Sequence, residues 1–306
     1  MDIRMNIILA HIQLMRPANI VTAIADILAG FAVSGAALQL FSSEIGYTPS
    51  LSNSILWLIV ATIGLYGGGI VFNDVFDAEL DRKERPERPI PSGRASVLSG
   101  SILAVILFII GFVAAWQVSV LSAIIALAVA ILAVLYNAWG KHQLIFGPVN
   151  MGLCRGGNLL LGMSAIPAAI QDLWFIALLP VIYIAAITMI SRGEVHGGNK
   201  KAIVGGAVMY GIIILAIIVL AFLSEVVWWQ VMPFVVLFSF LIFRPLIKAL
   251  RKQEPKLIGK AVKAGVLSLI VLNASLATVF AGWIYGLVVL LLLPVSLLIA
   301  KKFSVT

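Results

Sequence analysis

One amide and three carboxylates follow one another at helical spacing in a short stretch of the chain. Asn73, Asp74, Asp77 and Asp81 would fall within an arc of about 100° on a helix that turns ~100° per residue. Like charges on one helix face repel each other, so a bound cation would stabilise the arrangement. Oxygen ligands of this kind suit Mg²⁺, which shares its shell with water and substrate phosphates. The stretch therefore predicts catalytic residues that hold magnesium beside a phosphorylated substrate.

Basic residues follow this stretch at once. They are Arg82, Lys83, Arg85, Arg88 and Arg94. Guanidinium groups pair well with phosphate oxygens, so we expect Arg85 and Arg88 to bind the phosphates that the metal leaves free. For the carboxylates alone, an ordinary charged loop between two membrane helices is the alternative interpretation.

The composition shows what kind of protein carries these motifs. Hydrophobic residues make up 62% of the 306 residues and charged residues 11%, and the mean hydropathy is +1.11. These values exclude a soluble globular protein. A membrane-spanning helix needs ~20 apolar residues, so the chain predicts an all-α, polytopic transmembrane bundle that forms one domain over residues 1–306. The single cysteine, Cys154, excludes an intramolecular disulfide.

Ten apolar runs are candidate spans. They cover residues 19–40, 53–76, 97–116, 119–138, 148–168, 173–191, 203–223, 227–247, 261–281 and 283–300. All but one of the 21 Lys and Arg residues lie at the ends that include the aspartate-rich stretch, and the opposite loops contain none. The positive-inside rule then predicts ten spans in the inner (plasma) membrane, with both termini and the aspartates in the cytoplasm. This asymmetry also explains the pI near 9.7 without a nucleic-acid partner.

Polar residues inside the apolar runs form a second set of candidates. Asn19 and Asp26 lie in the first run, whereas Arg155 and Asn158 lie three residues apart, on one face of the fifth. An Asp or Arg at the bilayer centre costs ~2.5–3.5 kcal/mol, so such residues face a cavity or a partner. Asn19 is near the cytoplasmic end and within reach of a substrate headgroup. Asp26 would pair with Arg155 or contact an acceptor, and a purely structural ion pair is the alternative.

The order of the two motifs resembles the first signature of the UbiA superfamily of intramembrane prenyltransferases. The matching residues are Asn-Asp-x-x-Asp-x-x-x-Asp at 73–81 and Arg-Pro-x-Arg-Pro-Ile-Pro-Ser-Gly at 85–93. The resemblance implies that Asp74, Asp77 and Asp81 bind a prenyl diphosphate through Mg²⁺ while the basic residues grip the diphosphate. It also implies a bundle of nine core spans, to which the last apolar run would add a tenth.

The resemblance extends to the fourth and fifth runs. The family often has a Tyr and a Lys at the cytoplasmic end of the fourth span, which implies substrate contacts for Tyr136 and Lys141. A lone Lys at a helix end is also an ordinary topology signal. The Asn-x-x-x-Gly pattern formed by Asn158 and Gly162 corresponds to one that the family often carries near its active site.

The family's second aspartate-rich motif is depleted in this chain. It is expected after the sixth span, where residues 191–201 read Ser-Arg-Gly-Glu-Val-His-Gly-Gly-Asn-Lys-Lys. Glu194 is the one acid left at the three positions and is the metal ligand expected there. The expected substrate-binding residues around it are Arg192, His196, Asn199 and Lys200. Together with Cys-Arg-Gly-Gly-Asn at 154–158, this string resembles the EboC-type branch of the superfamily, which is associated with natural-product precursors.

These features predict Mg²⁺-dependent transfer of a prenyl group from a prenyl diphosphate to an aromatic or other lipophilic acceptor. Ionisation of the diphosphate would leave an allylic cation inside an apolar bundle that excludes water. The alternative is a non-catalytic or divergent relative that handles or exports a natural-product precursor. An ion-coupled transporter would bind at the membrane midplane, whereas the polar clusters of this chain lie at the cytoplasmic ends.

Overall fold

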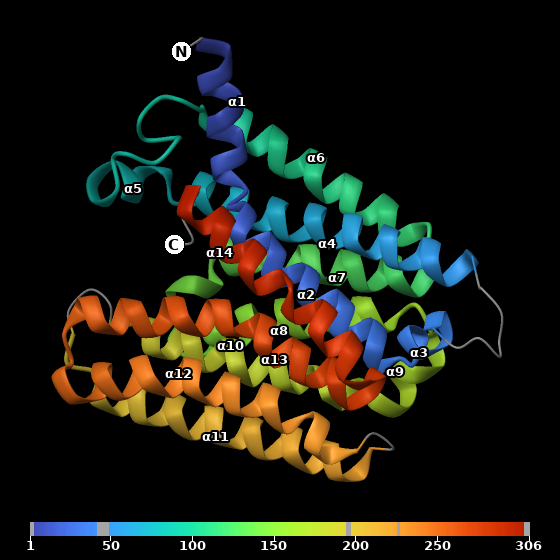
Figure 1. Cartoon of the computed structure of the whole chain (residues 1–306). Coiled ribbons are helices and arrows are strands. Elements are labelled where there is room, and N and C mark those ends of the chain that lie inside the picture. Colours follow the sequence, from blue (N-terminus) through green and yellow to red (C-terminus); the bar gives the residue numbers. More distant parts are fainter. Residues whose placement is uncertain (1–2, 42–48, 194–196, 225–226, 303–306) are drawn as a thin grey trace.

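The computed structural model describes residues 3–41, 49–193, 197–224 and 227–302, and all the regular secondary structure within these ranges is helical (Figure 1). The helices are α1 (Ile3–Leu14), α2 (Pro17–Val33), α3 (Ala36–Phe41), α4 (Pro49–Phe76), α5 (Ala78–Glu84), α6 (Val97–Trp116), α7 (Val120–Ala138), α8 (Phe146–Met163), α9 (Pro167–Leu173), α10 (Leu178–Ser191), α11 (Lys200–Leu223), α12 (Met232–Lys252), α13 (Pro255–Leu290) and α14 (Leu292–Lys302). Short 3₁₀ turns, η1 (Gly140–His142), η2 (Trp174–Ala177) and η3 (Trp228–Gln230), complete the order.

The expected all-helical, multi-pass architecture is confirmed. Within the described ranges, seven helical segments are long and apolar enough to cross a membrane, or eight when α1 and α2, which meet at a 42° bend, count as one span. The last of these segments, Pro255–Lys301, unites two of the runs predicted from sequence. It bends at Gly282, whose φ of 82° is one that few other residues adopt.

Helix α8 is not among those seven segments, yet it lies at the centre of the bundle. It packs against α2, α7 and α10, so its polar residues and glycines face protein rather than lipid. A Cβ at Gly30 of α2 would lie 2.1 Å from the carbonyl oxygen of Leu159, and one at Gly162 would lie 2.4 Å from that of Ile27. Glycine at both positions therefore lets α2 and α8 meet backbone to backbone.

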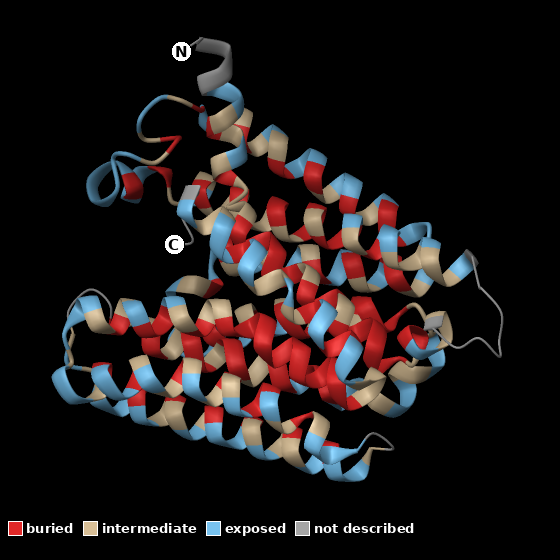
Figure 2. Cartoon of the chain, viewed as in Figure 1, coloured by how far each residue is buried: buried red, intermediate tan, exposed pale blue. Residues whose placement is uncertain are grey.

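The outer helices expose apolar side chains, and the inner helices bury theirs (Figure 2). Ile109 of α6 is 57% exposed and Leu215 of α11 is 62% exposed, whereas Leu159 and Tyr183 are fully buried. An apolar outer surface of this extent is typical of a protein that faces lipid tails.

The chain after Gly282 doubles back along α2. The Tyr285 hydroxyl donates to the Leu28 carbonyl oxygen (3.1 Å), and Ser296 donates to that of Ala18 (3.0 Å). Because α2 runs in the opposite direction, α14 ends near the start of α2. It therefore finishes at the end of the bundle that carries α5 and α1 (Figure 1).

Candidate active site at one end of the bundle

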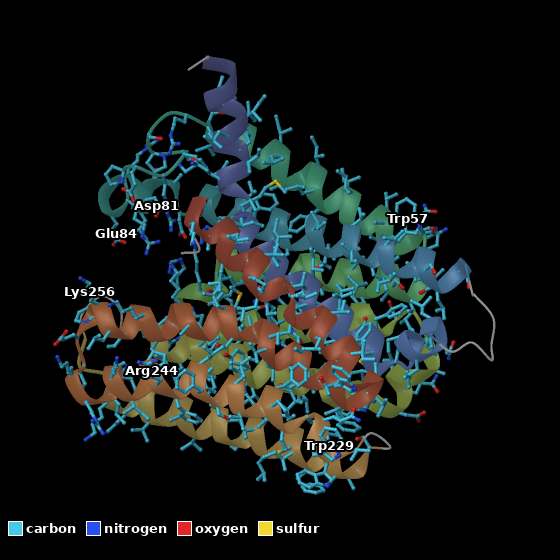
Figure 3. The ribbon with its side chains drawn as sticks, viewed as in Figure 1. Trp57, Asp81, Glu84, Trp229, Arg244 and Lys256 are labelled. Atoms are coloured by element: carbon cyan, nitrogen blue, oxygen red, sulfur yellow. The ribbon has the colours of Figure 1, made fainter. Side chains whose placement is uncertain are left out.

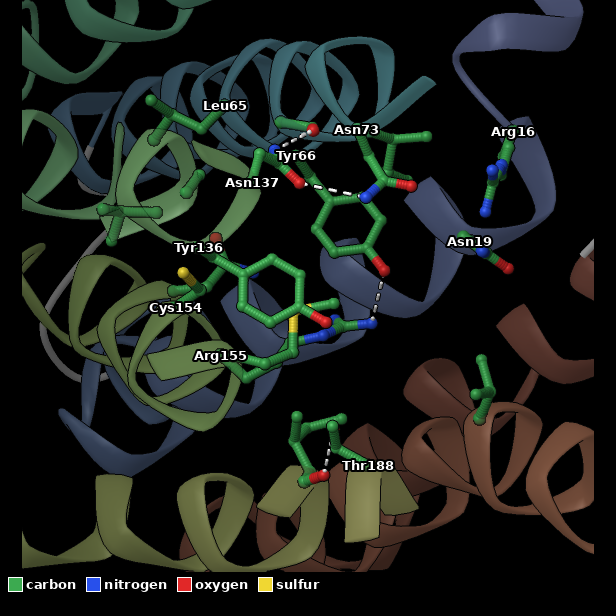
Figure 4. Close-up of a pocket in the computed structure, with 18 of the residues that line it drawn as sticks. Arg16, Asn19, Leu65, Tyr66, Asn73, Tyr136, Asn137, Cys154, Arg155 and Thr188 are labelled. Atoms are coloured by element: carbon green, nitrogen blue, oxygen red, sulfur yellow. Dashed lines mark hydrogen bonds between the residues drawn. The ribbon is translucent and has the colours of Figure 1, made fainter. Parts of the chain in front are cut away.

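A cavity of about 250 Å³ opens near the helix ends that carry the first motif (Figure 4). Its walls come from α2, α4, α7, α8, α10 and α13. The polar lining residues are Arg16, Asn19, Tyr66, Asn73, Tyr136, Asn137, Arg155, Asn158 and Thr188. Leu65, Val129, Ile184 and Leu269 are among the apolar ones. A polar mouth above an apolar interior suits an amphiphilic ligand.

Each aspartate of the first motif is paired with a cation. Asp74 is buried and accepts from Arg16 (2.6 Å) and Arg88 (3.4 Å), and Arg88 also donates to Asp81 (2.7 Å). Asp77 forms an ion pair with Lys141 of η1. The aspartates are therefore compensated by side chains from the α1–α2 bend, the loop after α5 and the turn after α7.

The local backbone differs from the single helix expected over residues 73–81. α4 ends at Phe76, and α5 begins at Ala78. Asp77 lies between them with φ −91° and ψ 4°, although its N–H still donates to the carbonyl oxygen of Asn73. Among the residues that the structure describes, no group of three or more Asp, Glu, His or Cys side chains is arranged to hold a metal ion.

Asn73 is positioned by a chain of amide hydrogen bonds. Its Nδ2 donates to Oδ1 of Asn137 (3.0 Å), and Nδ2 of Asn137 donates to the carbonyl oxygen of Gly69 (2.9 Å). This chain links α4 to α7 beside the cavity. Tyr136, the residue before Asn137, lines the same cavity, and its contact with a substrate remains a prediction.

Arg155 and Asp26 form a buried ion pair below the mouth. The pair is compatible with both the functional and the purely structural interpretation of Asp26. Nη1 of Arg155 donates to Asp26 (2.5 Å), and Nη2 donates to Thr22 (2.5 Å) and to the Tyr66 hydroxyl (3.2 Å). The guanidinium also lies 4.6 Å from the centre of the Tyr66 ring, a cation–π contact (Figure 4).

Amide groups complete the surroundings of Asp26. Asn158 donates to Asp26 (3.1 Å) and to the Ala23 carbonyl oxygen (2.9 Å), and it accepts from Thr62 (2.8 Å). Asn273 of α13 donates to the other oxygen of Asp26 (2.6 Å). Arg155 and Asn158 thus share one face of α8, as their spacing predicts, and both line the cavity.

Several predicted residues lie away from the cavity. Arg85 and Lys200 are exposed and do not line it. Arg192 donates to the carbonyl oxygen of Gln143 (3.0 Å), and the Asn199 side chain caps α11 by accepting from the N–H of Ala202 (3.1 Å). Substrate contacts for these four residues remain predictions.

Two other residues of the second motif, Glu194 and His196, lie outside the described residues. Their expected roles as a metal ligand and a phosphate donor therefore also remain predictions.

Sequence reasoning did not single out Arg16, Tyr66 or Thr188, all of which line the cavity. Tyr66 had a usable signal, because it lies seven residues before Asn73, which is two helical turns and therefore the same face. From the sequence alone Arg16 indicates only topology, because its partner Asp74 lies on another helix.

Comparison with known proteins identifies the family to which the chain belongs and the fold that it shares. Residues 28–262 match the UbiA prenyltransferase family. A digeranylgeranylglyceryl phosphate synthase of Methanothrix thermoacetophila is 38% identical over 160 residues, which are 52% of this chain and 56% of that protein. The corresponding protein of Saccharolobus solfataricus is 31% identical over 182 residues, 59% of this chain and 60% of its own length. The chain therefore spans little more than half the length of these relatives.

Solved structures show the same fold. A UbiA homologue from Archaeoglobus fulgidus bound to GPP and Mg²⁺ has a TM-score of 0.66 at 12% identity, over 92% of this chain and 99% of that one. The apo structure of a UbiA homologue from Aeropyrum pernix K1 has a TM-score of 0.63 at 16% identity, over 82% of this chain and 96% of that one. Neither comparison tests the resemblance to the EboC-type branch. With the match across residues 28–262, this chain belongs to the UbiA prenyltransferase family.

Proposed function

We propose that this protein transfers a prenyl group from a prenyl diphosphate to a lipophilic acceptor in the membrane, with the help of Mg²⁺. The observation that carries the proposal is a largely apolar and aromatic cavity that Arg16 and Asn73 line beside the ion pairs of the first motif. Family membership and the relatives named digeranylgeranylglyceryl phosphate synthase support it.

Asp74 and Asp77 are the residues that would hold Mg²⁺, with Asp81 assisting. The donor set fits this ion: the side chains offer oxygen atoms, and Mg²⁺ needs only one or two protein carboxylates beside water and substrate phosphates. Glu194 would contribute a ligand from the second motif. When bound, the ion would supply charge stabilisation at the diphosphate leaving group. A related structure that contains both GPP and Mg²⁺ supports this assignment.

The cations at the mouth would bind the diphosphate oxygens. Arg16, Arg88 and Lys141 each form an ion pair with an aspartate in the structure. Guanidinium and ammonium groups form strong, charge-assisted hydrogen bonds with phosphate, so an arriving diphosphate competes well for them. Pre-placed donors of this kind stabilise charge that develops on a leaving group, an effect worth about 10²–10³ in rate per donor.

Further contacts to the substrate would come from two asparagines of the cavity, from the loop after α5 and from the second motif. Asn19 and Asn73 line the cavity near its mouth and would donate to the diphosphate or orient it. The remaining expected contacts come from Arg85, Arg192, His196, Asn199 and Lys200. Movement of the loops toward the ligand would be needed for the exposed Arg85 and Lys200.

The interior of the cavity would hold the prenyl chain and the acceptor. The rings of Tyr66 and Tyr136 project into it near Arg155 (Figure 4). Aromatic faces attract cations, so they would stabilise an allylic cation that apolar walls protect from water. Arg155 and Asn158, fixed by Asp26, would bind the polar group of the acceptor. The named relatives make a glyceryl phosphate lipid, so a phosphorylated lipid alcohol belongs in the acceptor panel with aromatic acids.

The finer topology belongs to the same proposal. Nine core spans and a tenth formed by the chain after Gly282 would place both termini and the cavity mouth in the cytoplasm, in the plasma membrane. The distribution of Lys and Arg supports this orientation. The return of α14 along α2 supports an even number of crossings.

The test is an assay of diphosphate release and of prenylated product, by mass spectrometry, on the full chain in lipid nanodiscs. A series of prenyl diphosphates is combined with aromatic and lipid acceptors, with and without Mg²⁺. Asp77→Asn should lower the rate by about 10²-fold or more. Glu79→Gln is the matched control, because Glu79 is an exposed acid two residues further along the same motif, and it should stay near the parent rate.

Two outcomes would contradict the proposal. Equal activity of Asp77→Asn and Glu79→Gln would show that Asp77 has no role in the reaction. Mg²⁺-dependent diphosphate binding without release of diphosphate, whatever the acceptor, would favour the alternative of a non-catalytic protein that handles a prenyl precursor.

A further inference from the structure

A second recess lies between the ends of α12 and α13, away from the cavity described above. It has a volume of about 240 Å³ and is lined by Arg244, Pro245 and Lys248 of α12 and by Leu257 and Lys260 of α13. None of these residues lines the larger cavity. Figure 3 shows Arg244 at the end of the bundle that also carries Asp81 and Glu84.

The recess is strongly basic. Three of its five lining residues are cations, and all three are exposed. Between Arg244 and Lys263 the sequence has seven Lys and Arg residues against one acid, Glu254. Within the described parts of the chain, none of the ion pairs involves a lining residue of the recess. The uncompensated charge favours an anionic ligand.

The cations lie at different depths along the helices, which distinguishes the recess from an ordinary basic helix end. Arg244 lies eight residues before Lys252, the last residue of α12, or ~12 Å along the axis. Lys248 is one turn from Arg244 on the same face. Lys260 faces them from the first turns of α13. A topology signal needs only charges at the end of a helix, whereas this row extends about two turns inward from the end of α12.

Apolar groups at the deep end of the recess suit a lipid. The guanidinium of Arg244 lies 5.4 Å from the centre of the Phe240 ring, one turn further from the helix end. Phe240 is 55% exposed, and Ile247 is 45% exposed on the same helix. A phosphate bound by the cations would therefore have its acyl chains beside an exposed apolar surface. A soluble phosphate would make no use of that surface.

We propose that the recess formed by Arg244, Lys248 and Lys260 binds the phosphate headgroup of an anionic membrane lipid. Basic pockets between helices on the cytoplasmic side of a membrane bind such headgroups, and each basic residue near an anionic surface contributes about 1 kcal/mol. The recess shares no residue with the active-site cavity, so the inference holds whatever reaction the cavity performs.

The test is native mass spectrometry of the full chain in detergent, titrated with phosphatidylglycerol, with phosphatidylcholine or with inorganic phosphate. In the recess variant, Arg244→Gln is combined with Lys248→Gln. In the control variant, Arg251→Gln is combined with Lys252→Gln, which removes the same charge from exposed residues outside the recess. The recess variant should bind phosphatidylglycerol about 30-fold more weakly, and the control less than 3-fold.

Three results would overturn the proposal. An equal loss in both variants would show diffuse attraction to the basic surface. Equal binding of phosphatidylcholine and phosphatidylglycerol by the parent protein would exclude an anionic-lipid site. Displacement of the lipid by inorganic phosphate at an equal concentration would indicate a soluble-anion site. Thermal unfolding in lipid-free detergent checks that both variants are folded.

Discussion

Replacement of Asp26 by Asn tests the polar cluster that holds Arg155 in the cavity. Asp26 is fully buried and accepts hydrogen bonds from Arg155, Asn158 and Asn273. The change removes the negative charge and leaves one acceptor oxygen. Arg155, which is 4% exposed, then has only neutral hydrogen-bond partners.

The expected cost follows from the charge rather than from the hydrogen bonds. A buried charge that loses its partner costs about 3–5 kcal/mol, and an Arg at the centre of a bilayer costs ~2.5–3.5 kcal/mol. A hydrogen bond within a membrane protein contributes only ~0.6 kcal/mol on average. Asp26→Asn should therefore lower the free energy of unfolding by about 3–4 kcal/mol, mainly because Arg155 becomes an uncompensated charge.

A double-mutant cycle separates the ion pair from packing. Arg155→Gln alone leaves Asp26 uncompensated and should cost about as much as Asp26→Asn. The double variant leaves no buried charge and should be more stable than either single variant, with a coupling energy of about 2 kcal/mol or more. Unfolding by SDS titration in mixed micelles, followed by circular dichroism, gives the four free energies.

Ser275→Ala is the control for removing a buried polar group. Ser275 is fully buried, and its hydroxyl donates only within its own helix, to Val271 (2.8 Å). Its replacement should cost less than about 1 kcal/mol. The reasoning is refuted if Asp26→Asn costs no more than this control, or if the two single effects simply add.

In the double variant, a raised KM for the acceptor would report the loss of Arg155 from the cavity separately from stability.

Three further outcomes are expected. Gly30→Ala should lower the free energy of unfolding by about 1–3 kcal/mol because its Cβ would meet α8 backbone, whereas Gly211→Ala, with open space at that point, should be neutral or stabilising; SDS titration measures both. Glu194→Gln should weaken Mg²⁺-dependent diphosphate binding less than Asp77→Asn in calorimetry. Glu194 is the lone acid of its motif, too few to hold a second ion there, so the metal is expected mainly at Asp74 and Asp77; an equal loss would contradict this. A cysteine introduced at residue 304 should react with an impermeant reagent only from the cytoplasmic face. Labelling from the external face would contradict the prediction of a tenth span.

The sequence was sufficient for features that depend on local pattern. Apolar runs mark helices because each must satisfy its own backbone hydrogen bonds in lipid. Arg155 inside an apolar run predicts that its side chain faces a cavity or a partner, because a guanidinium in a lipid-facing position would be too costly, and it does both. Seven apolar segments in the described structure rather than ten reflect three facts. Helix α2 has only 17 residues and counts as a span only together with α1, α8 is too polar to count, and the run before Gly282 joins the run after it.

The side-chain partners of the first motif could not be predicted, because they join distant parts of the chain. The pair between Asp26 and Arg155 could be expected, because two opposite charges inside apolar runs need each other. Asp74 pairs with Arg16 across 58 residues, and Asp77 pairs with Lys141 across 64. The spacing of the aspartates indicates mutual repulsion, but it contains no information on which cations face them. Asn199 shows a second reason why site residues are hard to predict. A polar residue in a glycine-rich string suggests a substrate contact, but the Asn199 side chain also caps the start of α11.

The ion pairs at the mouth explain why a metal would accompany the diphosphate. Three carboxylates face three cations there, so the mouth is close to neutral before any ligand binds. A free diphosphate brings roughly three negative charges next to a buried aspartate, and charges this close interact strongly in a partly buried site. The magnesium complex brings most of that charge already neutralised, so the same mouth accepts it at a much smaller electrostatic cost. On this reasoning Asp77→Asn weakens binding through the metal, whereas loss of Lys141 would leave Asp77 unpaired and make the mouth more acidic.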